Sequence, residues 1–144
     1  MVRKSEEFTW KDVDILPYKE DGTHFKSITR QTLFVGTDDL PVELRYFEIG
    51  PGGHSTLEKH QHQHKVMIIR GSGKVFVKDS VTEIGMNDLV HIPAWTWHQF
   101  RAVNDEPLGF LCIVANDRDR PTRPQDIDIE ALSQNEAVKE FIRF

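Results

Sequence analysis

The chain has 144 residues, of which 38% are hydrophobic and 28% are charged, and its formal net charge is -5 at pH 7. This length fits one globular domain, and no apolar run approaches the roughly 20 residues that cross a bilayer. Lysine and arginine are scattered instead of forming a basic stripe, so neither nucleic acid nor a membrane is an expected partner. The charged start, MVRKSEEFTW, does not resemble a secretory signal, and a cytoplasmic location is expected.

Residues 1–24 are expected to form an N-terminal arm that lies along the body of the domain. Residues 25–115 alternate short strand-like runs with turns rich in Gly, Pro, Asn and Asp, without a long 3.6-residue periodicity. The expected strands are FKSITRQTLFV, VELRYFEIG, STLEKH, KVMIIRG, GKVFVKD, VTEI, DLVHIP, HQFRAV and GFLCIVA. This spacing is typical of an antiparallel sandwich or barrel, and we predict an all-β domain.

The C-terminal part of the chain differs in character. Residues 116–126 are charged and contain proline, and they are expected to form a connector across the surface. In residues 127–144, Ser133 and Glu136 fit a capping box, which predicts a short helix from about Gln134. The apolar residues that would share one face of this helix are Val138, Phe141 and Ile142. That face is expected to dock on the barrel or on a second subunit.

The stretch EKHQHQH places three histidines at alternate positions behind a glutamate. In a strand, Glu58 and His60 would project from one face, with Cα atoms about 6.5 to 7 Å apart. A turn would then bring His64 to the start of the next antiparallel strand, and His98 opens another strand after a proline-containing turn. These four residues are the predicted metal ligands, whereas His62 is expected to lie in the turn and face water. A solvated polar run is the alternative interpretation of the three neighbouring histidines.

Two stretches resemble the paired motifs of the cupin superfamily. GPGGHSTLEKHQHQHKVMIIRGSG is similar to the first motif and GMNDLVHIPAWTWHQFRAVN to the second. Positions that usually hold His, His and Glu fall on Glu58, His60 and His64, and the histidine of the second motif falls on His98. The resemblance implies a single cupin domain over 1–144, folded as a jelly-roll-like double-stranded β-helix around one divalent metal ion. This chain would hold the ion through three histidines and a glutamate, with the glutamate at an exchanged position.

Three neutral imidazoles and one carboxylate leave a divalent ion with a net charge of about +1, and an octahedral ion would keep two positions open. Fe, Mn, Ni, Co, Cu and Zn are all candidates for this ion. The side chains expected to line a substrate pocket beside it are Val66, Ile68, Trp95, Trp97 and Phe100. Plain filling of the barrel core, or packing of aromatic rings under a loop, is the alternative explanation for these side chains.

The favoured interpretation is a metalloenzyme for small molecules, either dioxygenase-like or an isomerase or lyase. Its chemical agent would be a metal-bound water at the four ligands, because the sequence offers neither a nucleophile triad nor a phosphate loop. A non-catalytic cupin that binds or senses a small ligand is an alternative, and a barrel with a vestigial site is another. A homodimer is also expected, because open sheet edges and the outward-facing Met67 and Ile69 need cover. Cys112, inside an apolar run, is expected to be a buried thiol.

Overall fold

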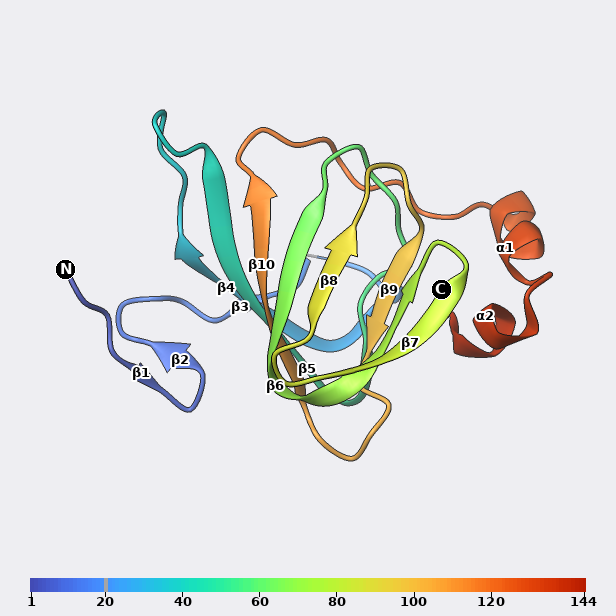
Figure 1. Cartoon of the computed structure of the whole chain (residues 1–144), viewed down its shortest axis with the longest axis horizontal. Coiled ribbons are helices and arrows are strands. Elements are labelled where there is room, and N and C mark those ends of the chain that lie inside the picture. Colours follow the sequence, from blue (N-terminus) through green and yellow to red (C-terminus); the bar gives the residue numbers. More distant parts are fainter. Residues whose placement is uncertain (20) are drawn as a thin grey trace.

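The computed structural model describes residues 1–19 and 21–144, and β-strands dominate it (Figure 1). The strands are β1 (Ser5–Glu6), β2 (Thr9–Trp10), β3 (Leu16–Pro17), β4 (Lys26–Phe34), β5 (Val42–His54), β6 (His64–Val77), β7 (Ser80–Gly85), β8 (Leu89–Ile92), β9 (His98–Arg101) and β10 (Leu108–Ala115). Two short helices follow, α1 (Asp126–Leu132) and α2 (Glu136–Phe141). None of the helices in the described ranges is long and apolar enough to cross a membrane.

The large sheet closes on itself because two short strands each join the same two long strands. β10 pairs antiparallel with β5 along its whole length and with β6 over most of it. β9 pairs antiparallel with β6, and its Arg101 also meets His54 of β5. The strands β5, β10, β6 and β9 therefore form a closed ring, which protects the backbone groups that an open sheet would expose. The predicted all-β double-stranded β-helix is confirmed.

Several expected boundaries differ from the structure. β5 extends beyond the expected strand VELRYFEIG, through the GPGG segment, to His54. β6 runs unbroken through the GSG segment, where the sequence predicts a turn. Gly71 makes this possible, because it has a positive φ of 63° and a Cβ at this position would overlap the carbonyl oxygen of Pro107. The expected strand STLEKH is replaced by two isolated bridges, Glu58 to His98 and Lys59 to Thr122. This segment pairs with different partners at successive residues, so it never forms a continuous ladder.

The hydrophobic core fills the barrel, as the alternation of apolar residues in the strands predicts. Residues that are fully buried there include Ile49, Ile68 and Leu108, each with 0% of its surface exposed. Cys112 is 2% exposed, which confirms the expected buried thiol. A second cluster lies where the C-terminal segment docks on the barrel, and it contains Leu57, Phe76, Val138, Phe141 and Ile142. The docking face predicted for the C-terminal segment is therefore confirmed.

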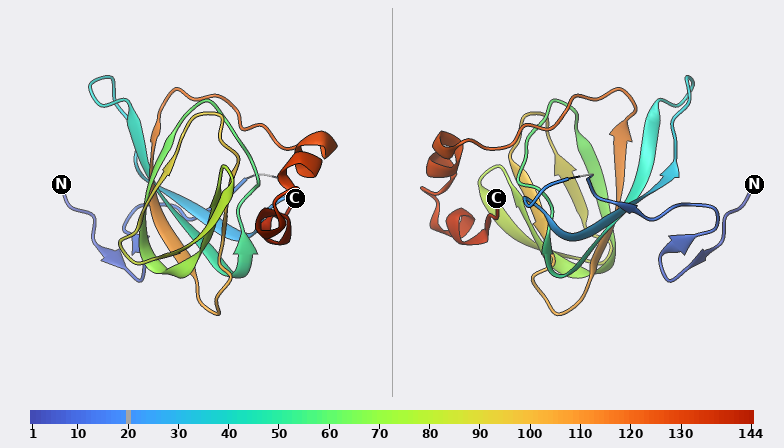
Figure 2. Two further views of the ribbon diagram at one scale, coloured as in Figure 1. Left: turned by 45° about the vertical axis from the view of Figure 1, so that its right-hand side comes forward. Right: turned by 180° about the vertical axis from the view of Figure 1, so that it is seen from behind.

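Two helices occupy the region where the sequence predicts one. α1, which was not expected, begins with a capping box between Gln125 and Asp128. Ser133 ends α1, and Asn135 caps α2 by accepting a hydrogen bond from the backbone N–H of Val138. In two further views, the helices and the N-terminal β1–β2 hairpin extend from opposite sides of the barrel (Figure 2). The hairpin is anchored by aromatic rings, because Trp10 packs 5.3 Å from the ring of Tyr46.

Candidate metal centre

Three pieces of chain bring the predicted ligands together. Glu58 and His98 lie opposite one another in an antiparallel bridge, and each backbone N–H donates to the carbonyl oxygen of the other, at 3.2 and 3.0 Å. Directly opposed residues in an antiparallel pair project from the same face, so both side chains point into the same space. His60 is fixed by its carbonyl oxygen, which accepts a 2.7 Å hydrogen bond from the backbone of Trp95. His64 is the first residue of β6.

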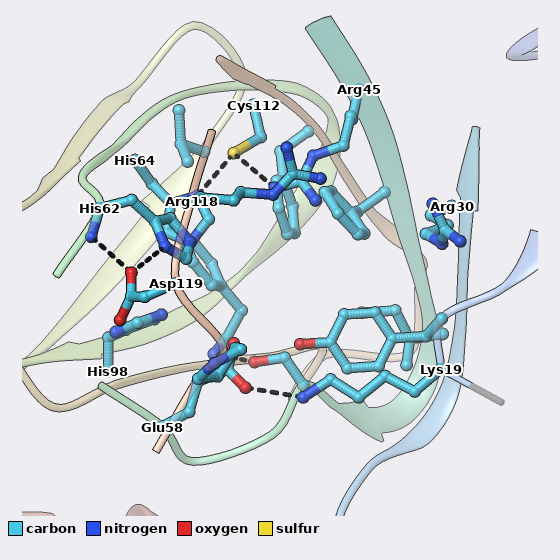
Figure 3. Close-up of a pocket in the computed structure, with 18 residues that line it drawn as sticks. Lys19, Arg30, Arg45, Glu58, His62, His64, His98, Cys112, Arg118 and Asp119 are labelled. Carbon is cyan, nitrogen blue, oxygen red and sulfur yellow. Dashed lines mark hydrogen bonds and ion pairs between the residues drawn. The ribbon is translucent and has the colours of Figure 1, made fainter. Parts of the chain in front are cut away.

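The ligand atoms gather around His60. Glu58, His60 and His98 each offer a ligand atom within 4.8 Å of the others, and so do His60, His62 and His64. The ring of His60 lies 4.6 Å from that of His64 and 4.9 Å from that of His98, measured between centroids. In Figure 3 the imidazoles of His62, His64 and His98 lie on the same side of the pocket. The two groups share His60, so the four predicted ligands belong to one continuous cluster, in which His62 is a further donor.

Burial favours the neutral form of three of the imidazoles, those of His60, His64 and His98, by lowering their pKa values. His60 is 1% exposed and His98 is 4% exposed. Burial, together with the neighbouring ring of His98, lowers the pKa of His60 to about 4. Burial also lowers the pKa of His64 and that of His98. Neutral imidazole is the form that binds a metal ion, so the cluster has the protonation state that ligation requires.

The hydrogen bonds of two histidines decide which ring nitrogen faces the centre. Nδ1 of His60 lies 2.6 Å from the carbonyl oxygen of His62, and Nδ1 of His98 lies 2.9 Å from that of Thr96. A carbonyl oxygen can only accept, so Nδ1 carries the hydrogen in both rings. The Nε2 atom of each neutral ring then carries a free lone pair. Such fixing of the tautomer by a hydrogen bond to the other ring nitrogen is a common property of metal-binding histidines.

His60 and His64 face one another through their Nε2 atoms, which are 2.9 Å apart. Two nitrogens that bind one ion at about 2.0 to 2.1 Å each lie about 3 Å from one another. This spacing fits two ligands of a shared divalent ion. Nδ1 of His64 lies 3.0 Å from Cys112 Sγ, so in the metal-binding tautomer its N–H would donate to the sulfur. The residues present therefore fit the metal that the cupin resemblance implies.

The prediction that His62 faces water is wrong. Its side chain is only 8% exposed, and its ring stacks on that of His60 with the centroids 3.7 Å apart. Asp119 holds it there, because Asp119 Oδ1 accepts from His62 Nδ1 at 2.8 Å. Although partial desolvation opposes it, hydrogen bonding from His62 and from the backbone N–H of Gln61 keeps the pKa of the Asp119 carboxyl well below its usual range. The connector folds back over the histidine turn, a long-range contact that local sequence does not reveal.

The carboxylate of Glu58 is buried, with 6% of the residue exposed, and it has a basic partner. Lys19 Nζ donates to Glu58 Oε2 at 2.7 Å and to Thr56 Oγ1 at 3.0 Å. This ion pair compensates the charge of a carboxylate that is largely removed from water. Tyr18 lies beside the pair, and burial followed by the negative charge of Glu58 raises the pKa of its hydroxyl. Two residues of the predicted arm therefore belong to the site.

A pocket of about 270 Å³ adjoins the cluster. Its apolar lining residues are Ile28, Phe47, Val66, Phe100 and Phe110, and its basic ones are Lys19, Arg30, Arg45 and Arg118. Val66 and Phe100 are the predicted pocket residues that line it. Ile68 lies in the core instead, and the two tryptophans lie outside the lining. Trp95 is 57% exposed, whereas Trp97 packs against the C-terminal helix cluster, so neither closes the pocket.

Several lining residues were missed from the sequence, and their signals differ. Alternation along β5 places Arg45 on the same face as Phe47, and alternation along β10 places Cys112 on the same face as Phe110. Arg45 and Cys112 could therefore have been predicted as pocket residues, because strand alternation points their side chains into the barrel. Lys19 and Asp119 lie in segments without periodicity, so the sequence carries no comparable signal for them.

Comparisons with known proteins agree with this architecture. The family described as cupin domain matches residues 45–114. The chain is 53% identical to the 1-methylthio-D-xylulose 5-phosphate methylsulfurylase of Rhodospirillum rubrum over 137 residues. The matched region covers 94% of this chain and 87% of that protein.

Solved structures show the same fold. A cupin 2 conserved barrel domain protein from Rhodopseudomonas palustris superposes with a TM-score of 0.95 at 42% identity, covering 100% of both chains. A cupin-2 domain protein from Rhodospirillum rubrum gives a TM-score of 0.88 at 50% identity, covering 98% of this chain and 95% of that chain. With a closed barrel, a buried histidine and glutamate cluster, and relatives at this identity, the chain belongs to the cupin domain family.

Proposed function

We propose that this cupin is a metal-dependent enzyme that acts on a methylthio-substituted sugar phosphate and breaks the bond between the sulfur and the sugar. The observation that carries the proposal is the 53% identity, over 94% of the chain, to a protein named as a methylsulfurylase of such a substrate. The buried cluster gives the proposal a chemical basis, since it can present several neutral imidazoles and a carboxylate to one ion. Among the reaction types left open by the sequence, this proposal favours lyase-like chemistry over a dioxygenase.

The ligand set and its surroundings fit this chemistry. A divalent ion held by Glu58, His60, His64 and His98 would act as a Lewis acid toward the oxygen of a ketose carbonyl. Three of the four side chains are held in place by contacts to the ring nitrogen that would face away from the ion. Cys112 and the carbonyl oxygens of His62 and Thr96 each contact the Nδ1 atom of one imidazole, at 2.6 to 3.0 Å.

The pocket wall suits a methylthio group. Phe100 and Phe110 stack with their ring centroids 4.5 Å apart, and Phe47 stacks on Phe110 at 5.6 Å. All three rings line the pocket and are at most 5% exposed. Thioether sulfur makes favourable contacts with aromatic rings, and an apolar wall also excludes water from the carbon–sulfur bond. The methylthio end of the substrate would therefore lie against these rings.

The assay must supply an acceptor for the sulfur. A carbon–sulfur bond next to a ketone can break with both electrons left on carbon, because the carbonyl group stabilises them. The methylthio sulfur then bonds to the sulfur of a small thiol, the thiol proton ends on the sugar carbon, and a mixed disulfide and a deoxyketose phosphate result. We therefore include a low-molecular-weight thiol in the test.

The test follows 1-methylthio-D-xylulose 5-phosphate by NMR and mass spectrometry with the metal-loaded protein. We expect turnover that is abolished by a chelator and restored by adding back a divalent metal. His60→Ala should be inactive, whereas His91→Ala should retain activity, because His91 is an exposed histidine of β8 outside the cluster. Saturable binding of the sugar phosphate without any turnover, with every candidate metal, would contradict the proposal and favour a binding or sensing protein.

A further inference from the structure

Two arginines project from the inner face of the barrel wall. Arg30 of β4 pairs with Phe47 of β5, and Thr32 pairs with Arg45 in the same antiparallel ladder. Arg30 and Arg45 are therefore diagonal neighbours on one face, with Cα atoms on the order of 7 to 8 Å apart. Phe47 belongs to the buried core, so this face is the inward one, and both arginines line the pocket. Figure 3 shows them on the side away from His62 and His98.

Arg45 is short of partners in the part of the chain that the structure describes. Its Nε is buried there without a hydrogen-bond acceptor. Its terminal NH2 group reaches only the weak acceptor Cys112 Sγ, at 3.8 Å, and its guanidinium carbon lies 4.9 Å from the ring of Phe47. A guanidinium that is partly removed from water is stabilised by an anion or by strong acceptors. Arg45, which is half-buried, has a stacking surface but no carboxylate partner among residues 1–19 and 21–144.

The other two basic side chains that line the pocket already have carboxylate partners. Arg118 is bound to Glu43 at 2.8 Å, and Lys19 to Glu58 at 2.7 Å. Arg30 and Arg45 form no ion pair with a carboxylate among residues 1–19 and 21–144. They therefore remain available to an anion from outside.

The pocket is positive although the protein is acidic. Four basic side chains but only two carboxylates, those of Glu58 and Asp119, line it. The whole chain carries a formal net charge of -5. A cleft of one sign with low-dielectric walls concentrates ligands of the opposite sign. The charges that line this pocket thus favour an anionic ligand.

We infer that Arg30 and Arg45 form the subsite for the phosphate monoester of the substrate, on the β4–β5 wall of the pocket. This inference rests on the proposed function, because it assigns one end of the same substrate. Guanidinium groups bind phosphate oxygens through parallel N–H donors, which neither a neutral side chain nor a single lysine reproduces. With the ketone at the metal cluster and the methylthio group against the aromatic rings, the phosphate at the other end of the five-carbon sugar would then lie at the arginines.

The test compares Arg30→Met and Arg45→Met with wild type, because methionine keeps an apolar stem and removes the charge. Each variant should raise KM for 1-methylthio-D-xylulose 5-phosphate by roughly 10- to 100-fold, the range expected for a lost charge-assisted contact, with a smaller change in kcat. KM for unphosphorylated 1-methylthio-D-xylulose should change less than threefold. Arg3→Met, which removes an exposed charge outside the pocket, should match wild type. Unchanged KM for the sugar phosphate in both arginine variants would overturn the subsite and leave the proposed function standing.

A second measurement separates this inference from the proposed function. Calorimetric titration of the metal-loaded protein with inorganic phosphate needs no turnover. Binding to wild type that weakens at least tenfold in both arginine variants, with equal melting temperatures, would support the subsite even if the methylthio sugar is not converted. Equal phosphate affinity in wild type and both variants, or no binding to wild type, would overturn it.

Discussion

The inward-facing side chains of β5 and β10 are apolar near one end of the barrel and polar or charged further along it. Near one end Ile49 pairs with Leu108, and both are fully buried apolar residues. Further along the same ladder Arg45 pairs with Cys112, next to His64 at the start of β6. The apolar end can only contribute burial to stability, whereas the polar end places charged and metal-binding groups where water is scarce. Substitutions at the two ends should therefore affect different properties: the free energy of unfolding at one, and ligand binding at the other.

The largest effect on stability is expected at the apolar end. Ile68→Ala should lower the free energy of unfolding by about 2 to 5 kcal/mol, because it leaves a cavity in a core position that is 0% exposed. Urea denaturation measures this loss. Ile113→Ala is the matched control, because Ile113 is 46% exposed and should change stability by about 0.5 kcal/mol or less. Equal losses in the two variants would contradict the assignment of the core.

At the polar end, the next largest expected effect is on the stability that the protein gains when it binds a metal ion. At a free metal concentration of about 100 times Kd, wild type should gain about 2.7 kcal/mol of stability. His60→Ala should lose this gain, because His60 belongs to both groups of ligand atoms. Thermal denaturation with and without metal provides the measurement. A variant that metal stabilises as much as wild type would show that His60 is not a ligand.

A smaller effect is expected at Cys112, which touches the cluster without belonging to it. Cys112→Ala removes the partner of His64 Nδ1 and should weaken metal affinity by roughly 10- to 100-fold. Cys112→Ser, which retains an acceptor atom, should lose less. Competition with a chromophoric chelator gives the affinities. If serine and alanine weaken metal binding equally, the contact with His64 has no role in orienting the ring.

Lowering the pH should destabilise the metal-free protein. An unfolded histidine has a pKa of about 6.5, and burial lowers that of His60 to about 4. Between these values the unfolded state binds more protons, so stability falls as pH falls, by up to about 1.4 kcal/mol per pH unit for each such histidine. Urea denaturation of wild type and His60→Gln at pH 7, 6 and 5 measures the difference. Parallel pH curves for the two proteins would contradict the lowered pKa.

Alternation and turn residues were sufficient to predict an antiparallel β domain and the strands that carry His64 and His98, but not the irregular segment that carries Glu58 and His60. The same local reasoning placed Glu58 and His60 on one face. The bridge that sets His98 opposite Glu58 joins distant segments, and His98 was identified from its place after a proline-containing turn and from the cupin resemblance. Local reasoning failed for His62, whose position depends on Asp119, 57 residues away. The expectation that Trp95 and Trp97 line the pocket was also wrong, because the sequence of a loop without periodicity does not indicate which way its side chains point. Dimerisation and the cytoplasmic location stay predictions.

Elemental analysis of purified protein tests most directly whether one ion lies at the polar end. After expression with supplemented divalent metals, wild type should contain close to one metal ion per chain, and both Glu58→Ala and His64→Ala should lose it while remaining folded. Full metal content in both variants, or a wild-type protein that retains none, would contradict the metal centre described above.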